Sequence, residues 1–177
     1  MRPTILSFGS RNLRVNGLLL WNLCDKPCMV TLQLPPDFKE FLQLLNDNEV
    51  EYLLVGGYAV AYYGYPRATG DIDFWLAVDP NNAARMVAVL DAFGFGSSGT
   101  TPDVFLQDDN IVQMGVPPMR IDLFTTLSGV TFADCFARRV QDVIDGIAVN
   151  IISLEDLKAN KQASGRLKDL NDLSQLP

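Results

Sequence analysis

The chain has 177 residues, of which 48% are apolar and 20% are charged, so we expect one globular domain with a single core. It contains no histidine, which excludes Ser-His-Asp and Cys-His catalysis as well as zinc sites that use histidine ligands. The net charge of −7 argues against a protein whose whole surface coats nucleic acid.

The cysteine content bears on the compartment. Cys24, Cys28 and Cys135 are too few for a four-thiolate zinc site, and their odd number fits a reducing compartment better than a disulfide framework. We therefore expect a cytoplasmic protein. Its apolar runs are far shorter than the roughly 20 residues that span a membrane, so no membrane partner is expected.

Residues 1–28 differ in composition from the rest of the chain, because they carry four basic residues against one acidic residue. They show neither a helical nor a strand period. We expect them to form a loosely attached N-terminal arm, or else Met29 to be the native start, with the folded domain at residues 29–177. The intact mass of the natively expressed protein distinguishes these alternatives.

The first elements of the domain follow from apolar spacing. An amphipathic helix is expected after Pro36, where Asp37 is placed to open the first turn and apolar residues recur at helical intervals: Phe38, Phe41, Leu42 and Leu45. The apolar run at 52–55, closed by two glycines, predicts a strand, a glycine turn and a helix at 58–63.

The remaining pattern alternates strands and helices. It predicts a strand at 71–76, a helix from 80 to 93, short strands at 104–107 and 111–114, a strand at 119–125, a weak helix at 132–138, a strand at 147–152 and helices from Ser153 onward.

Asp71 and Asp73 are the strongest chemical signal in the sequence. Alternation along a strand sends both carboxylates to one face, roughly 7 Å apart at their Cα atoms. Two like charges in this position are tolerated if they are solvated, if one is protonated, or if a divalent cation lies between them. An exposed, solvated pair is the common alternative to a metal site.

Two neighbouring features favour the metal site. Gly56 and Gly57 precede a predicted helix and offer backbone N–H groups to phosphates. Asp122 is a third acid, and it lies inside an otherwise apolar strand, where an unpaired charge is costly.

These residues carry a family resemblance. The strings EYLLVGGYA at residues 51–59 and RATGDID at 67–73 resemble nucleotidyltransferases of the DNA polymerase β-like superfamily. The segment ISLEDL at 152–157 and the charged residues after it resemble the C-terminal part of minimal bacterial proteins related to AbiE-type abortive-infection toxins; these charged residues are Lys161, Arg166, Lys168, Asp169 and Asp172. The resemblance covers about residues 36–176.

The resemblance implies an α/β (α+β) fold with a mixed β-sheet flanked by helices, and it implies two Mg²⁺ ions. Asp71 and Asp73 would hold the ion that carries the nucleotide phosphates. Asp122 would join them around a second ion that activates an acceptor hydroxyl, and it would serve as the base. The other nucleotide-binding residues implied are Gly56, Gly57, Arg67 and Lys161, with Arg166 as a further cation; ordinary solvated charges are the alternative for these three cations.

One departure from the family pattern concerns the glycine turn. Many relatives have Gly-Ser where this chain has Gly56-Gly57, so a serine hydroxyl is not available to the phosphates. The backbone amides of the turn remain as donors.

The implied activity is Mg²⁺-dependent transfer of a nucleoside monophosphate from an NTP to an acceptor hydroxyl. The resemblance suggests an RNA end or a protein as acceptor, in a toxin–antitoxin or phage-defence system with a cognate toxin or antitoxin partner. Two alternatives stay open at this point. One is a non-catalytic, antitoxin-like binding module that keeps the fold, and the other is an antibiotic nucleotidyltransferase.

Overall fold

The computed structural model describes residues 32–96, 99–116 and 118–177. The arm expected at residues 1–28 lies outside these ranges, and so does Met29.

The described residues form a six-stranded mixed sheet with the order β3-β4-β2-β1-β6-β5. β1 runs parallel to β6 and β2 runs parallel to β4, whereas the other neighbours are antiparallel. The predicted fold class is therefore confirmed. The strands are β1 (Tyr52–Val55), β2 (Asp71–Leu76), β3 (Ile111–Met114), β4 (Arg120–Phe124), β5 (Val140–Ile144) and β6 (Ile147–Ile151).

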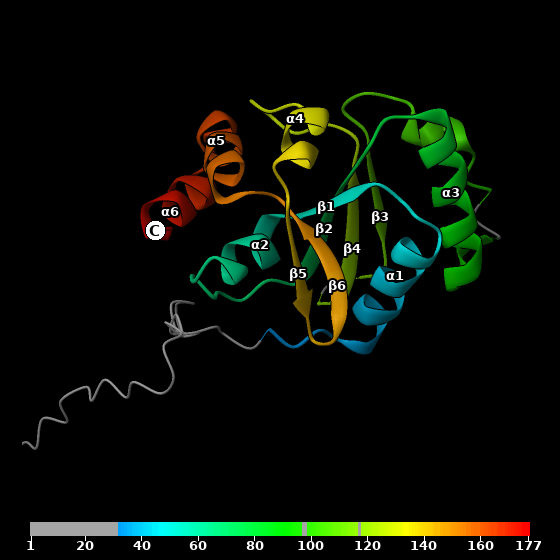
Figure 1. Ribbon diagram of the computed structural model, residues 1–177, viewed down its shortest axis with the longest axis horizontal. Coiled ribbons are helices and arrows are strands. Elements are labelled where there is room, and N and C mark those ends of the chain that lie inside the picture. Colours follow the sequence, from blue (N-terminus) through cyan, green and yellow to red (C-terminus); the bar gives the residue numbers. More distant parts are fainter. Residues whose placement is uncertain (1–31, 97–98, 117) are drawn as a thin grey trace, which may run out of the picture.

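Helices cover both faces of this sheet. Figure 1 shows α1 and α3 on one side and α2, α5 and α6 on the other. The helices are α1 (Pro36–Asp47), α2 (Gly56–Tyr62), α3 (Pro80–Leu90), α4 (Phe132–Ala137), α5 (Leu154–Ser164) and α6 (Leu167–Gln175), with a π-helical segment η1 (Asp91–Phe95) and a 3-10 helix η3 (Pro102–Phe105).

The core holds the two central strands rigidly in place. All four residues of β1 are buried, and α1 buries the apolar residues that its spacing predicted. Phe41 of α1 packs against Phe74 of β2, with ring centroids 5.7 Å apart. Close packing of this kind restricts the position of both strands. It therefore positions the start of α2, which follows β1 directly, and the first residues of β2.

One sequence-based expectation is wrong, and one strand was missed. The segment expected as a strand at 104–107 overlaps the 3-10 helix η3, because Pro102 fixes φ and lacks an N–H, while Phe105 turns inward and is buried. The edge strand β5 was not expected, since its exposed positions interrupt the apolar pattern. Asp145 and Gly146 both have positive φ between β5 and β6, so the Asp-Gly pair was the available hairpin signal.

The C-terminal helices begin as expected. Ser153 caps α5 by accepting a hydrogen bond from the Asp156 N–H at 3.2 Å, and Gly165 ends the helix in the left-handed conformation. None of the helices in the described ranges combines the length and apolar character that crossing a bilayer requires.

Candidate active site

The sheet topology brings the three predicted acids together. β2 and β4 are parallel neighbours, and their register places Asp73 opposite Asp122 and Asp71 opposite Arg120. One carboxylate oxygen from each of Asp71, Asp73 and Asp122 lies within 4.8 Å of the other two. Acids from two strands that are distant in sequence therefore form one cluster, which we call the acid triad (Asp71, Asp73 and Asp122).

The three carboxylates have different partners. Asp122 is 4% exposed and accepts two hydrogen bonds from the Arg120 guanidinium, at 2.7 and 2.8 Å. Asp71 accepts one from the Thr69 hydroxyl at 2.6 Å and one from Arg120 at 2.9 Å. Asp73 accepts a longer one, 3.3 Å, from the backbone N–H of Gly57. Charge compensation in the triad is therefore uneven.

Asp73 is the member whose charge is least well stabilised. Burial, together with the charge of Asp71, raises the pKa of its carboxyl to about 6, and the Gly57 N–H and the more distant Lys168 only partly oppose this. An ionised carboxylate held in this way gains more than an ordinary one when a cation approaches. The arrangement therefore favours a positive ion beside Asp73.

The two glycines predicted to form a turn are the first residues of α2, and they pack directly against the triad. Gly56 has a φ of +58°, and a Cβ atom there would lie 1.9 Å from Oδ2 of Asp73. At Gly57, a Cβ atom would lie 2.7 Å from the Thr69 hydroxyl oxygen. A side chain at residue 56 is therefore excluded by both the positive φ and the contact with Asp73, whereas a side chain at residue 57 would require Thr69 to move.

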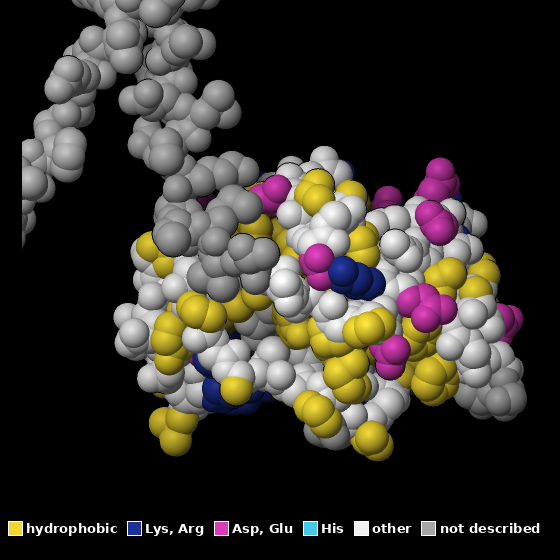
Figure 2. Space-filling model, turned by 90° about the horizontal axis from the view of Figure 1, so that it is seen from below, with side chains coloured by type: hydrophobic (Ala, Val, Ile, Leu, Met, Phe, Trp, Pro, Cys, Tyr) yellow, Lys and Arg dark blue, Asp and Glu magenta, His cyan; other side chains and the backbone are white. Residues whose placement is uncertain are grey.

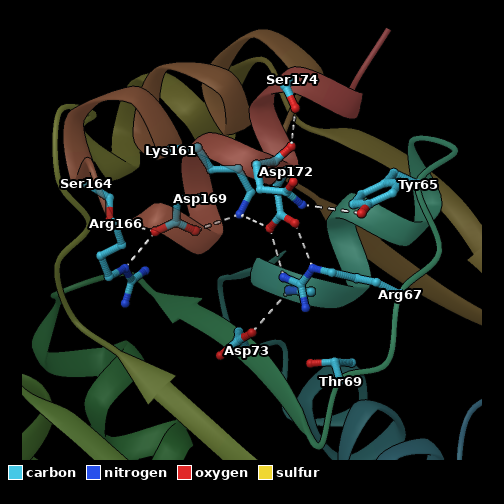
Figure 3. A network of polar contacts seen from close by, with 12 residues as sticks. Tyr65, Arg67, Thr69, Asp73, Lys161, Ser164, Arg166, Asp169, Asp172 and Ser174 are labelled. Atoms are coloured by element: carbon cyan, nitrogen blue, oxygen red, sulfur yellow. Dashed lines mark hydrogen bonds and ion pairs between the residues drawn. The ribbon is translucent and has the colours of Figure 1, made fainter.

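Arg67 links the start of β2 to the C-terminal helices. Its Nε and Nη2 donate to the two carboxylate oxygens of Asp172 on α6, at 2.7 and 2.8 Å. Figure 3 shows the Arg67 side chain between Asp172 and Asp73. Its Nη1 atom is buried and has no hydrogen-bond partner among the described residues. The guanidinium thus offers an unused donor close to the acid triad.

Lys161 was predicted to bind the nucleotide, but in the structure its ammonium pairs with two carboxylates. Its ammonium is buried and donates to Asp169 at 2.9 Å and to Asp172 at 2.8 Å. Burial alone would raise the pKa of Asp172, but hydrogen bonds from Arg67 and Lys161 outweigh it and hold this pKa below its ordinary value. Lys161 therefore neutralises buried carboxylates between α5 and α6 (Figure 3).

Arg166, the third cation considered, is 77% exposed and pairs with Asp169. Lys168 was not predicted to have a role at the site. Its side chain is exposed, and its positive charge acts to lower the pKa of Asp73. Arg120 was not singled out either. Its position two residues before Asp122 on the same strand was the signal that could have found it, since alternation sends both side chains to one face.

A comparison with protein families identifies the family of the chain. Residues 33–176 match a protein family described as "Nucleotidyltransferase of unknown function (DUF6036)". The chain belongs to this nucleotidyltransferase family. The family match and the fold together confirm the superfamily expected from the sequence. None of the curated proteins compared with this nucleotidyltransferase matches it.

Two solved structures share the fold of this nucleotidyltransferase. One is a Thermotoga maritima protein described as a nucleotidyltransferase, with a TM-score of 0.50, 12% identity, and coverage of 78% of this chain and 88% of the other. The second is the antibiotic-resistance factor ANT(2'')-Ia, with a TM-score of 0.51, 12% identity, and coverage of 78% and 79%. At this identity the likeness concerns the fold alone.

Proposed function

We propose that this protein is a Mg²⁺-dependent enzyme that transfers a nucleoside monophosphate from an NTP to an acceptor hydroxyl and releases pyrophosphate. The acid triad carries this proposal, because three carboxylates within 4.8 Å of one another include one, Asp73, whose pKa is raised to about 6. A fold without a ligand at this place would gain stability by replacing such a residue.

The donor set fits a hard divalent cation. All three triad side chains offer carboxylate oxygens, the ligands that Mg²⁺ prefers. We propose that Asp71 and Asp73 hold one ion and that all three acids hold a second. Mg²⁺ bound there makes the acceptor hydroxyl easier to deprotonate and stabilises charge on the attacking and leaving oxygens.

In this proposal, side chains around the triad bind the phosphates and accept the proton of the acceptor hydroxyl. The unused Nη1 donor of Arg67 and the exposed ammonium of Lys168 bind the phosphates, while Asp172 holds the Arg67 guanidinium in position. The backbone of Gly56 and Gly57, at the start of α2, lies against Asp73. The resemblance to the superfamily assigns Asp122 as the acceptor of the hydroxyl proton, and the chain has no histidine that could take this role.

We favour a protein or small-molecule acceptor over an RNA end. The net charge is −7, and the Lys and Arg side chains on the face shown in Figure 2 lie in small separate groups rather than in one broad patch. The relation to AbiE-type toxins, a cognate toxin or antitoxin and a cytoplasmic setting stay predictions from the sequence.

The test is transfer of label from each of the four α-³²P NTPs, with Mg²⁺, into total RNA, into cell-lysate protein and into an added aminoglycoside or lincosamide. The wild type is compared with Asp71→Asn/Asp73→Asn and with Glu40→Gln/Asp47→Asn, a control that removes the same charge from exposed positions of α1. We expect label with the wild type and the control and none with the triad variant. No label from any NTP contradicts the proposal and favours a non-catalytic binding module. Label confined to an added aminoglycoside or lincosamide identifies an antibiotic nucleotidyltransferase.

A further inference from the structure

The guanidinium of Arg120 contacts two of the carboxylates that are proposed to bind the metal ion. Its Nη2 atom contacts Asp71 at 2.9 Å and Asp122 at 2.8 Å, so one nitrogen bridges two of the three acids. Its Nε atom donates to the second oxygen of Asp122 at 2.7 Å. These are charge-assisted hydrogen bonds, the strong class, and the pair with Asp122 is bidentate.

This contact is built into the sheet. The register between β2 and β4 places Arg120 directly opposite Asp71, and alternation along β4 places it on the same face as Asp122. Arg120 therefore reaches both acids from a fixed strand position. Its side chain is 27% exposed, so solvent has access to the guanidinium.

Oxygens on two of the three triad members are thus already engaged by a protein cation. Oδ2 of Asp71 and both oxygens of Asp122 accept from Arg120, and Oδ1 of Asp71 accepts from Thr69. A metal ion that uses Asp71 and Asp122 together has to displace the bridging Nη2 atom, because two cations repel each other at such short range.

We infer that Arg120 is a positioning residue that holds Asp71 and Asp122 in place without metal and competes with the metal ion for them, so that it sets the metal affinity of the site. This inference rests on the proposed metal-dependent function. It assigns Arg120 an effect that a purely structural ion pair lacks: removing the guanidinium weakens the metal-free fold and strengthens metal binding.

The test is calorimetric titration of Mn²⁺ into nucleotide-free protein. We expect Arg120→Gln to bind Mn²⁺ about tenfold more tightly than the wild type, since the ion no longer displaces a charge-assisted hydrogen bond. Arg120→Lys keeps the charge but loses the planar fork, so its affinity is expected between the two. Arg138→Gln is the matched control, because Arg138 makes a bidentate pair with Asp156 away from the triad, and it should bind Mn²⁺ as the wild type does.

Thermal unfolding of the same four proteins provides a second readout. Without divalent ions, Arg120→Gln and Arg138→Gln should both melt below the wild type; saturating Mn²⁺ should raise the melting temperature of Arg120→Gln by more than that of the others. Equal or weaker Mn²⁺ binding by Arg120→Gln, while the wild type binds, overturns the role of Arg120 and leaves the metal site intact. No Mn²⁺ binding by any of the four proteins overturns the metal site and this inference together.

Discussion

Replacing Asp73 with asparagine should stabilise the metal-free protein while abolishing its activity. The pKa of this carboxyl is raised from 3.8 to about 6, chiefly by burial and then by the charge of Asp71. A shift of roughly two units corresponds to about 3 kcal/mol of free energy that the folded state loses when Asp73 ionises. Asparagine keeps the shape and an oxygen that can accept from the Gly57 N–H, so the variant avoids this cost.

The sign of the pH dependence follows from the raised pKa. At low pH the carboxyl is protonated in both the folded and the unfolded state, so Asp73→Asn should change little there. As the pH rises from about 4 through about 6, the wild type loses stability and the variant does not. The gain should therefore be complete above about pH 7.

The measurement is urea unfolding without divalent ions, at about pH 3 and about pH 8. We expect Asp73→Asn to gain about 2 to 3 kcal/mol at the higher pH and almost nothing at the lower one. Glu40→Gln, which removes a charge from an exposed position in the middle of α1, should change neither value. A variant that is no more stable than the wild type at about pH 8, or equally stabilised at both pH values, would refute the reasoning.

Three further predictions concern stability and nucleotide affinity. Gly56→Ala should lower the free energy of unfolding by about 2 kcal/mol or more and abolish transfer, because the added methyl group would clash with Asp73 at a position of positive φ. A variant that unfolds at the same urea concentration as the wild type would contradict this. Asp172→Asn should lower the free energy of unfolding by about 3 kcal/mol, since Arg67 and Lys161 lose a buried anionic partner. It should also raise KM for the NTP more than it lowers kcat. An unchanged KM would show that Arg67 does not bind the phosphates. Phe41→Ala should cost about 3 to 5 kcal/mol in thermal or urea unfolding without changing Mn²⁺ affinity, as its ring is fully buried under β2.

Local patterns were enough to predict the elements that hold the triad. The apolar run of β1, the two glycines and the alternation through Asp71 and Asp73 each report on a few adjacent residues, and the structure has all three features. The pairing of β2 with β4 is different in kind. It joins residues 49 positions apart, so the closeness of Asp122 to the other two acids came from the family resemblance and not from any local signal.

The partners of charged side chains were the least predictable part of the site. Lys161 was expected at the triphosphate, but α6 folds back along α5 and brings Asp169 and Asp172 to its ammonium. The sequence around a charged residue on one helix does not predict which other helix packs against it. For Arg120, alternation along β4 predicts the shared face with Asp122, but the contact with Asp71 depends on the register between β2 and β4.

The most direct test of the central claim is which phosphorus atom of the NTP the protein transfers. Parallel reactions with α-³²P and γ-³²P NTP, in the presence of Mg²⁺, should put label into the acceptor from the α position only, and the γ label should leave as pyrophosphate. EDTA and Asp71→Asn/Asp73→Asn should each abolish the α signal. Label that enters the acceptor from the γ position would identify phosphoryl transfer and contradict the account, as would α transfer that survives loss of both carboxylates.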